Sequence, residues 1–320
     1  MRERGGIASD VAARYLTLFV NRAAYTVQST KPDEGGKYYY YRPKGRKRLG
    51  LNTIARHLSG EITFGLYAIN PSTQRSKWIA IDADYSDALE HLLKTQLELK
   101  KDFVHSALER SRRGAHLWIF TAQPLLACEC RLYIYNLATR LGIPIKTSGK
   151  SDGIEVFPRQ DRVGVDEFGN AIRGPLGIHR GAANRRFWFY GAQHSIGAQL
   201  SFLESLERLT EEHLRSLITG LEMPEAYKAR PVISLPPYDP LRKEFHILDH
   251  VPKGRRYGKD YRTKCPSCAL HGGDEKNRHL AISVSDPRIY HCWAGCKKED
   301  IRAAVGCPVK VYSLRSARSH

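Results

Sequence analysis

The chain has 320 residues and a formal net charge of +18, with 51 lysines and arginines against 33 aspartates and glutamates. Hydrophobic residues make up 42% of the chain, enough to bury a core, which excludes a wholly disordered protein. No stretch approaches the roughly 18 apolar residues of a membrane span, and the first ten residues lack an apolar secretory signal. We therefore expect a cytoplasmic protein whose partner is nucleic acid or an anionic membrane surface.

Hydrophobic spacing and turn residues predict helices and antiparallel strands in alternation, which is typical of an α+β fold. The predicted helices span residues 7–26, 51–58, 87–101, 131–141 and 203–221. The predicted strands span residues 63–69, 78–83, 104–109, 116–121, 154–157 and 187–190.

A proline-rich segment at 223–240 predicts an extended linker between two domains. It separates a body of catalytic size, 1–222, from a small module rich in cysteine and histidine, 241–307, with a basic tail at 308–320. Residues 241–320 hold 17 lysines and arginines against 8 aspartates and glutamates, a net charge of +9. Half of the positive charge therefore lies in the last quarter of the chain.

The most biased stretch is YYYYRPKGRKR at 38–48, in which four tyrosines precede five basic residues. Aromatic rings beside cations are typical of surfaces that stack on bases and pair with phosphates. The alternative is an edge strand followed by a solvated loop. The candidate nucleic-acid contacts here are Arg42, Lys44 and Arg46.

Two acids lie at the end of the predicted strand at 78–83 in the run KWIAIDADY, Asp82 within it and Asp84 directly after it. Strand residues two apart share a face, so these carboxylates lie side by side and repel each other unless a cation binds between them. Oxygen ligands of this kind favour Mg²⁺ or Mn²⁺, and two such ions can support phosphoryl transfer. The alternative is that Asp84 merely begins a turn.

The neighbouring predicted strands carry further polar groups. His116 opens an apolar strand after SRRGA, and Glu155 lies in the strand of GIEVFPRQ. Taken singly, a core histidine and an exposed strand acid are the simpler readings. Their order favours a site instead, with these candidate nucleotide contacts around it: Ser111, Arg113, Lys150 and Arg159.

The C-terminal module contains Cys265-x2-Cys268 and Cys292-x3-Cys296, separated by 23 residues. This spacing predicts a structural Zn²⁺ held by four thiolates, and the odd total of seven cysteines argues against a disulfide framework. His271 is an alternative ligand in place of Cys268. Residues 280–284 and 288–291 predict a hairpin between the two cysteine pairs.

A basic run precedes the first cysteine pair and predicts phosphate contacts, with a solvated linker end as the alternative. Its members are Arg255, Arg256, Lys259, Arg262 and Lys264.

Several motifs resemble the archaeo-eukaryotic primase superfamily, and most closely its primase-polymerase branch in mobile elements and TOTE-type conflict systems. They are FGLYAINPSTQRSKWIAIDAD, SRRGAHLWIF, IEVFPRQ and AIRGPLGIHR, within residues 40–195. The resemblance implies an RRM-like catalytic core with an N-terminal α/β unit. The segment with HCWAGC and EDIRAAVG resembles the CHC2-type zinc ribbon of bacterial and phage primases, which binds single-stranded template.

Carried over to this chain, the resemblance implies that Asp82, Asp84 and Glu155 are catalytic metal ligands. Gly114-Ala115-His116 matches the second motif, although the family usually has serine where Gly114 stands. The resemblance implies that His116 contacts the nucleotide phosphates and that His179 of the PLGIH run touches substrate.

We therefore expect a DNA primase that synthesises primers on single-stranded DNA from dNTPs or NTPs by two-metal nucleotidyl transfer, alongside a separate replicative helicase. Its setting would be the cytoplasm, for a mobile element, phage or plasmid. The alternatives are an inactive nucleic-acid-binding initiation protein, which would be expected to lose one of the three acids, and a metal-dependent nuclease.

Overall fold

The computed structural model describes residues 9–45, 48–146, 153–228 and 245–308. Contacts divide these residues into an N-terminal unit, up to 228, and a C-terminal unit, 245–308. Within these ranges no helix has the length and apolar character needed to cross a membrane.

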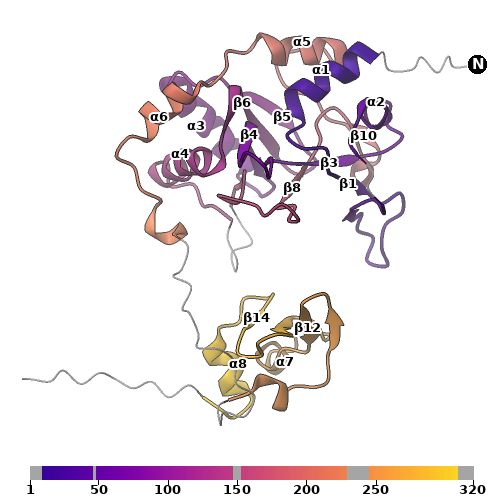
Figure 1. Cartoon of the computed structure of the whole chain (residues 1–320), viewed down its shortest axis with the longest axis vertical. Coiled ribbons are helices and arrows are strands. Elements are labelled where there is room, and N and C mark those ends of the chain that lie inside the picture. Colours follow the sequence, from indigo (N-terminus) through magenta and orange to yellow (C-terminus); the bar gives the residue numbers. More distant parts are fainter. Residues whose placement is uncertain (1–8, 46–47, 147–152, 229–244, 309–320) are drawn as a thin grey trace, which may run out of the picture. The chain divides into compact units, whose positions relative to one another are not determined.

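The central sheet of the N-terminal unit has the strand order β5-β6-β4-β7, and each neighbouring pair is antiparallel. Its strands are β5 (Ala107–Arg110), β6 (Ala115–Leu126), β4 (Arg75–Ala83) and β7 (Glu155–Phe157). The long pair β4 and β6 lies at the middle of this unit (Figure 1). Together with the helices described next, these antiparallel strands confirm the predicted α+β class.

One face of the central sheet is covered by α3 (Ala88–Lys101), α4 (Ala127–Arg140) and α6 (Glu211–Ile218). Ile79 and Ile81 of β4 pack into this layer, because alternate residues of a strand share a face. Figure 1 shows α3 and α4 on the side of the sheet away from α1.

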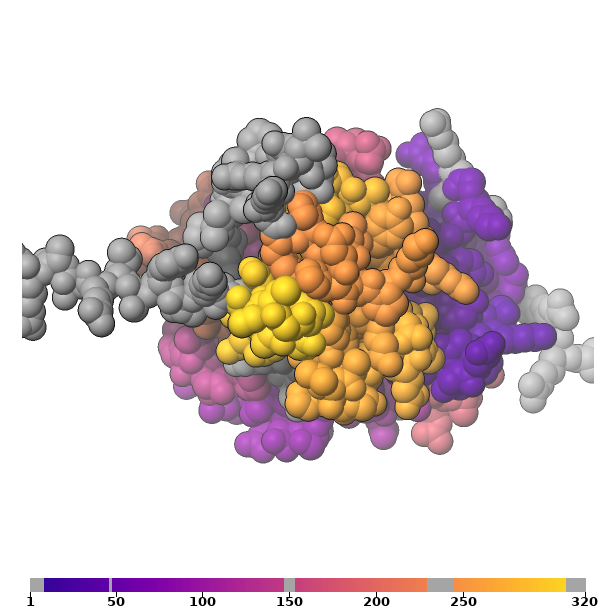
Figure 2. Space-filling view, turned by 90° about the horizontal axis from the view of Figure 1, so that it is seen from below, coloured from indigo at the N-terminus to yellow at the C-terminus, as the bar shows by residue number. Residues whose placement is uncertain are grey.

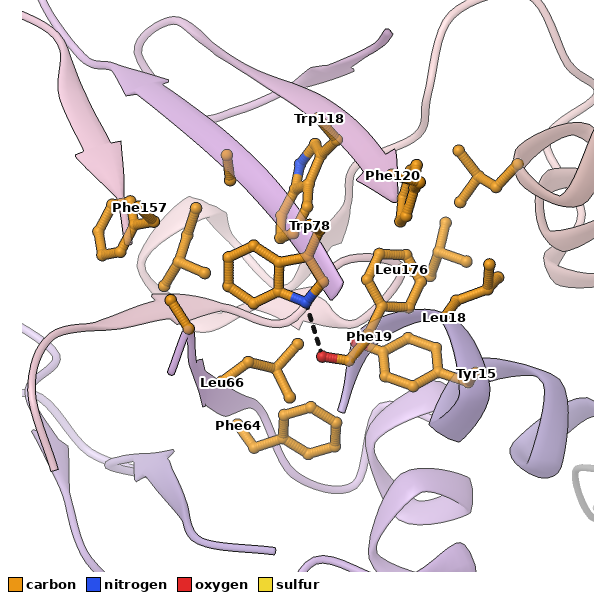
Figure 3. Close-up of a cluster of buried hydrophobic side chains, with 14 of the residues drawn as sticks. Tyr15, Leu18, Phe19, Phe64, Leu66, Trp78, Trp118, Phe120, Phe157 and Leu176 are labelled. Atoms are coloured by element: carbon orange, nitrogen blue, oxygen red, sulfur yellow. Dashed lines mark hydrogen bonds between the residues drawn. The ribbon is translucent and has the colours of Figure 1, made fainter. Parts of the chain in front are cut away.

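The opposite face of the central sheet presents Trp78 and Trp118, both fully buried, to α1 (Ser9–Phe19) and α5 (Ile196–Ser205). The Trp78 indole Nε1–H donates to the carbonyl oxygen of Phe19 at 2.8 Å (Figure 3). Fully burying a large apolar side chain contributes roughly 1.5–3 kcal/mol. This cluster therefore fixes α1 against the central sheet.

A second sheet completes the N-terminal unit, with the order β2-β1-β3-β8 and antiparallel pairing throughout. Its strands are β2 (Tyr40–Tyr41), β1 (Tyr25–Gln28), β3 (Phe64–Tyr67) and β8 (Ala171–Arg173), and α2 (Leu51–Leu58) packs against α1. The apolar face of this sheet joins the tryptophan cluster. The remaining short elements of the unit are β9 (Ile178–His179), β10 (Arg185–Arg186), η1 (Arg180–Ala182) and η2 (Glu225–Tyr227).

The predicted helix at 7–26 is wrong in its second half, where α1 ends and β1 begins. Asn21 explains the early end, because its side chain is tied to the start of β4. Its Oδ1 accepts the Lys77 N–H at 2.7 Å, and its Nδ2 donates to the Ser76 hydroxyl at 3.3 Å. This tertiary contact overrides the helical pattern.

The predicted helix at 203–221 is also wrong, because the chain forms two helices, α5 and α6. Leu206 has extended backbone angles after α5, and the Thr210 side chain accepts the His213 N–H as the N-cap of α6. The predicted strand at 187–190 is reduced to a single bridge between Phe189 and Glu109. The helix predicted at 51–58 is confirmed, and the one predicted at 131–141 begins earlier, at Ala127.

The C-terminal unit is a four-stranded antiparallel sheet with the order β11-β12-β13-β14. In Figure 2 it is the compact orange-to-yellow body. The predicted hairpin is confirmed as the pairing of β13 with β14. The bounds are β11 (Arg255–Tyr257), β12 (Asp260–Thr263), β13 (Leu280–Ser283), β14 (Tyr290–Cys292), α7 (Pro266–Leu270), α8 (Lys298–Ala304) and η3 (Ile247–Asp249).

Gly114 allows the start of β6 to pass close to the end of β4. A Cβ at this position would lie 2.0 Å from the Ala83 carbonyl oxygen and 3.0 Å from the Ala88 Cβ. We predict that Gly114→Ala lowers the free energy of unfolding by about 1–3 kcal/mol, as overpacking does, in urea titrations.

Gly197→Ala is the matched control, because a Cβ there meets nothing within 4 Å. Because alanine favours a helix more than glycine does, the free energy of unfolding of this variant should equal that of the parent or be slightly higher. Equal stability of the Gly114→Ala protein and the parent would contradict the close approach.

Candidate active site and zinc centre

Four polar side chains form a row across the central sheet. In the strand register Glu109 faces His116, His116 faces Asp82, and Asp82 faces Glu155. Residues directly opposite each other on antiparallel strands point to the same face. The row lies on the face that carries Trp78 and Trp118 further along the strands, so it begins where the apolar core ends.

Asp82 and Asp84 are both present at this end of β4, but their surroundings differ. Asp82 Oδ1 is buried, lies 3.4 Å from His116 Nε2 and has no hydrogen-bond partner among the described residues. Asp84 accepts from Arg113 Nη2 at 2.7 Å and from the Ser111 hydroxyl at 3.2 Å. Burial would raise the pKa of Asp84, but Arg113, His116 and Ser111 together lower it below its ordinary value.

Glu155 is engaged by two cations. Its carboxylate accepts from Arg159 Nη1 at 2.5 Å and lies 3.9 Å from Lys146 Nζ. Like Asp84, Glu155 is thus paired with an arginine. The carboxylate oxygens of the three predicted acids do not form one close group. Among the described residues, the possible metal-ligand atoms that do lie close together are the sulfurs of four cysteines.

His116 is held between two carboxylates. Its Nδ1 lies 2.8 Å from Glu109 Oε2, and its Nε2 faces Asp82. Burial alone would lower the pKa of His116, but Asp82 and Glu109 outweigh burial and raise it to about 9. The imidazole is therefore a cation at neutral pH.

Glu109 connects the two sheets of the N-terminal unit. Its side chain is fully buried and accepts from Arg173 Nη2 at 2.6 Å and from the Trp118 indole at 3.2 Å. Burial would raise the pKa of Glu109, but Arg173 and His116 lower it below its ordinary value. Because Arg173 belongs to β8, this ion pair joins the second sheet to the central sheet.

The row opens into a cleft of about 710 Å³ between the two sheets. Its rim is basic, and within the described residues Arg112 forms no salt bridge. Burial and the nearby Arg173 and Arg112 lower the pKa of His179 to about 4, so this ring is neutral. The polar lining residues are Gln28, Lys37, Tyr38, Tyr40, Asp82, Asp84, Ser111, Arg112, Arg113, His116, Glu155, Arg173, His179 and Arg180.

The predicted site residues meet different outcomes. Asp82, Asp84, Glu155, His116, Ser111, Arg113 and His179 line the cleft together. Arg159 does not line the cleft, but it donates a hydrogen bond to Glu155, which does. Arg42 and Lys44 do not line it, and Arg42 lies over the Phe168 ring instead. Lys150 and Arg46 lie outside the described residues.

Sequence reasoning missed Glu109 and Arg173. The available signal for Glu109 was an acid inside a predicted apolar strand, at ALER, because a buried acid needs a partner. Arg173 stands in the run AIRGPLGIHR, but its contact with Glu109 is 64 residues distant in sequence.

The C-terminal unit brings together the four predicted cysteines. The sulfur atoms of Cys265, Cys268, Cys292 and Cys296 all lie within 4.8 Å of one another. This arrangement suits a tetrahedral Zn²⁺ with four thiolates. His271, the alternative ligand, is exposed and lies outside this group.

Asp274 stabilises the loop between the cysteine pairs. Its buried carboxylate accepts backbone N–H groups of Cys265, Arg278 and His279. These bonds hold the first cysteine and the start of β13 together.

The predicted basic contacts of this unit lie on or beside its edge strands. Arg255 of β11 pairs with Arg262 of β12. Arg256 also lies in β11, and Lys264 directly follows β12. The Arg262 guanidinium lies 5.3 Å from the Tyr257 ring and 5.5 Å from the Trp293 ring, and Trp293 is 60% exposed.

Breaking the buried ion pair should be costly. Glu109→Gln leaves Arg173 buried without a counter-charge, so we predict a loss of about 3–5 kcal/mol in the free energy of unfolding. Adding Arg173→Met removes the orphaned charge, and the double variant should lose much less than the sum of the single variants. Urea titrations of the full double-mutant cycle measure this coupling.

The same cycle at Arg56 and Glu61 is the control. The Arg56 side chain is 45% exposed and the Glu61 side chain 57% exposed. Solvent should therefore reduce the coupling energy of this pair to near zero. Equal coupling in the two cycles would contradict a structural role for Glu109.

For the cysteine group, we predict that Cys265→Ser abolishes stoichiometric zinc binding and unfolds the C-terminal unit while the N-terminal unit stays folded. Structural zinc sites contribute binding free energy directly to folding. Metal analysis and hydrogen exchange mapped by mass spectrometry measure both effects. Cys128→Ser, at an exposed position of the N-terminal unit, should leave zinc content unchanged.

Comparisons with known proteins confirm the resemblance found in the motifs. The family model described as "TOTE conflict system, Archaeo-Eukaryotic Primase domain" matches residues 17–217. The chain is similar to the polymerase domain from Mycobacterium tuberculosis Ligase D in complex with DNA, at 14% identity and TM-score 0.35, over 66% of this chain and 88% of that chain. It is similar to the catalytic domain of primase Repb' in complex with initiator DNA, at 9% identity and TM-score 0.33, over 62% and 98% of the two chains. No curated protein matches it. Because the family model matches more than half of the chain, the protein belongs to the archaeo-eukaryotic primase domain family of TOTE conflict systems.

Proposed function

We propose that the chain is a DNA primase that joins nucleotides on a single-stranded DNA template by metal-dependent nucleotidyl transfer. The observation that carries this proposal is the register of β4, with Asp82 between His116 and Glu155 at the floor of a basic cleft. Acids for divalent cations and cations for phosphates then meet in one place, which is what phosphoryl transfer requires. Family membership supports the same reaction class.

Asp82, Asp84 and Glu155 would hold two Mg²⁺ or Mn²⁺ ions. The residues fit this role, because all three offer oxygen ligands to the cleft and the buried Asp82 Oδ1 lacks a hydrogen-bond donor among the described residues. Asp84 and Glu155 would exchange their arginine partners for the ions. When bound, divalent cations lower the pKa of an attacking hydroxyl and neutralise a leaving pyrophosphate.

The remaining groups of the cleft would bind the triphosphate of a dNTP or NTP. His116 supplies a buried positive charge fixed between Asp82 and Glu109. Arg112 and Arg113 supply guanidinium groups that suit phosphate oxygens, and His179 supplies a neutral ring. Preorganised charges of this kind act mainly by positioning and by stabilising the transition state.

Several wider assignments belong to the same proposal. The catalytic domain would span 1–222, the linker 223–240, the zinc-binding domain 241–307 and the basic tail 308–320. The zinc unit would bind template through Arg255, Arg256, Arg262 and Lys264. A separate helicase would open the duplex, in the cytoplasm of a bacterium that carries the mobile element, phage or plasmid.

Primer synthesis tests the reaction directly. Unprimed single-stranded DNA, labelled nucleotides and Mg²⁺ or Mn²⁺ should yield labelled oligonucleotides with the parent chain. We predict that Asp82→Asn/Asp84→Asn reduces their yield by at least a hundredfold, because the neutral amides bind divalent cations weakly. Product length on denaturing gels is the measurement.

Asp87→Asn is the matched control, because Asp87 is an exposed acid just beyond the site, and its yield should equal that of the parent. Labelled template fragments in place of products would support the nuclease alternative. Template binding without synthesis in the parent would support the inactive binding protein.

A further inference from the structure

We propose that a second pocket, at the start of β1, binds an unpaired nucleotide of the DNA template through Phe168, Arg42 and Arg48. This inference rests on the proposed function, because it assigns the course of the template strand outside the acid cleft. The pocket shares no residue with the acid cleft.

The shape and charge of the second pocket suit a nucleotide. Its volume is about 530 Å³, the small residues Ala23 and Ala24 line it, and none of its described lining residues is an aspartate or glutamate. Arg42 and Arg48 stand at its edge, are exposed, and form no salt bridge within the described residues. Two unpaired arginines at a pocket whose described lining contains no acid favour an anionic ligand.

Phe168 provides the surface for a base. The Arg42 guanidinium lies 4.0 Å from its ring centroid, and the Arg22 guanidinium lies 4.9 Å from it. Arg22 is anchored by donating to the Glu167 carbonyl oxygen at 2.9 Å. Bases stack on aromatic rings and on guanidinium planes irrespective of sequence, which suits a template strand of any composition.

A third hollow adjoins the acid cleft and extends towards the second pocket. This hollow of about 300 Å³ shares Tyr40, Ala171, Ile172 and Arg173 with the cleft. At its other end it is lined by Tyr67, whose ring centroid lies 5.5 Å from that of Phe168. The three hollows therefore follow one another along the second sheet, from the acids to Phe168.

The floor of this path is the polar face of the second sheet. Thr26 faces Gly65, and Gly65 faces Arg173 across the neighbouring strands. Small side chains in the middle of the row leave the depression, and Arg173 marks the end next to the acids. A single strand laid along this path would place one nucleotide at the acids and another on Phe168.

Oligothymidylates of increasing length, labelled with fluorescein, test the proposal by anisotropy with the full-length chain. The variant Arg42→Gln/Phe168→Leu should bind long oligomers roughly tenfold more weakly than the parent, as loss of a stacked base and a phosphate contact does. Oligomers too short to reach from the acids to Phe168 can occupy only one of the two sites at a time, so they should show a smaller difference between the two proteins. The affinity gained on lengthening should therefore shrink in the variant.

The matched control is Arg140→Gln/Phe103→Leu, which removes the same residue types from the helix-covered side of the central sheet. Phe103 is 79% exposed, and Arg140 lies at the end of α4. This control should bind every length like the parent. The single variant Phe168→Leu should also lose affinity for long oligomers, and its urea midpoint shows whether the fold is retained.

Equal binding of all lengths by the parent and the double variant would overturn the proposal. So would an equal loss in the control, or a folded Phe168→Leu variant that binds long oligomers like the parent, since general charge would then be sufficient. The assay contains no nucleotides, so its result does not depend on primer synthesis. If the chain shows the length effect but makes no primer, the result would support the template path and contradict the proposed reaction.

Discussion

The N-terminal unit depends on one buried ion pair, between Glu109 of β5 and Arg173 of β8. Beside the apolar cluster that the two sheets share, this polar contact joins the central sheet to the second sheet at the cleft. The same carboxylate also accepts from Trp118 and faces His116, so Glu109 contributes both to the packing of the core and to the charge of the site. Buried ion pairs are retained only when their remaining hydrogen-bond positions are filled, and Glu109 meets that condition.

The cleft arises from an ordinary property of β strands. Along one face of β4, the apolar residues Trp78 and Ala80 pack in the core, and Asp82 follows at the next position on that face. β6 repeats this change of polarity in the opposite direction, from Trp118 to His116. Asp82 therefore stands on a strand whose other end is fixed by aromatic packing, which gives it a rigid support, and Asp84 follows one residue after the end of β4.

Much of the site could be predicted from the sequence because its signals are local. Strand alternation specifies the face of Asp82, and cysteine spacing specifies the sulfur cluster. Asp84 lines the same cleft from one residue beyond the end of β4. Long-range contacts left no such signal. Asn21 ends α1 by binding the start of β4, and Glu109 finds Arg173 through the packing of two sheets. The Phe168 pocket likewise combines segments far apart in the chain.

The arginine partners of Asp84 and Glu155 have a thermodynamic consequence. In this structure Arg113 and Arg159 already neutralise carboxylates that cations would occupy. A polyphosphate that attracted Arg113 would free Asp84, and a cation that took Asp84 would free Arg113. Linkage requires such effects to be equal in both directions, so each ligand would strengthen the binding of the other by the same factor. Binding of the two ligands would thereby show heterotropic cooperativity, which favours the complete substrate complex.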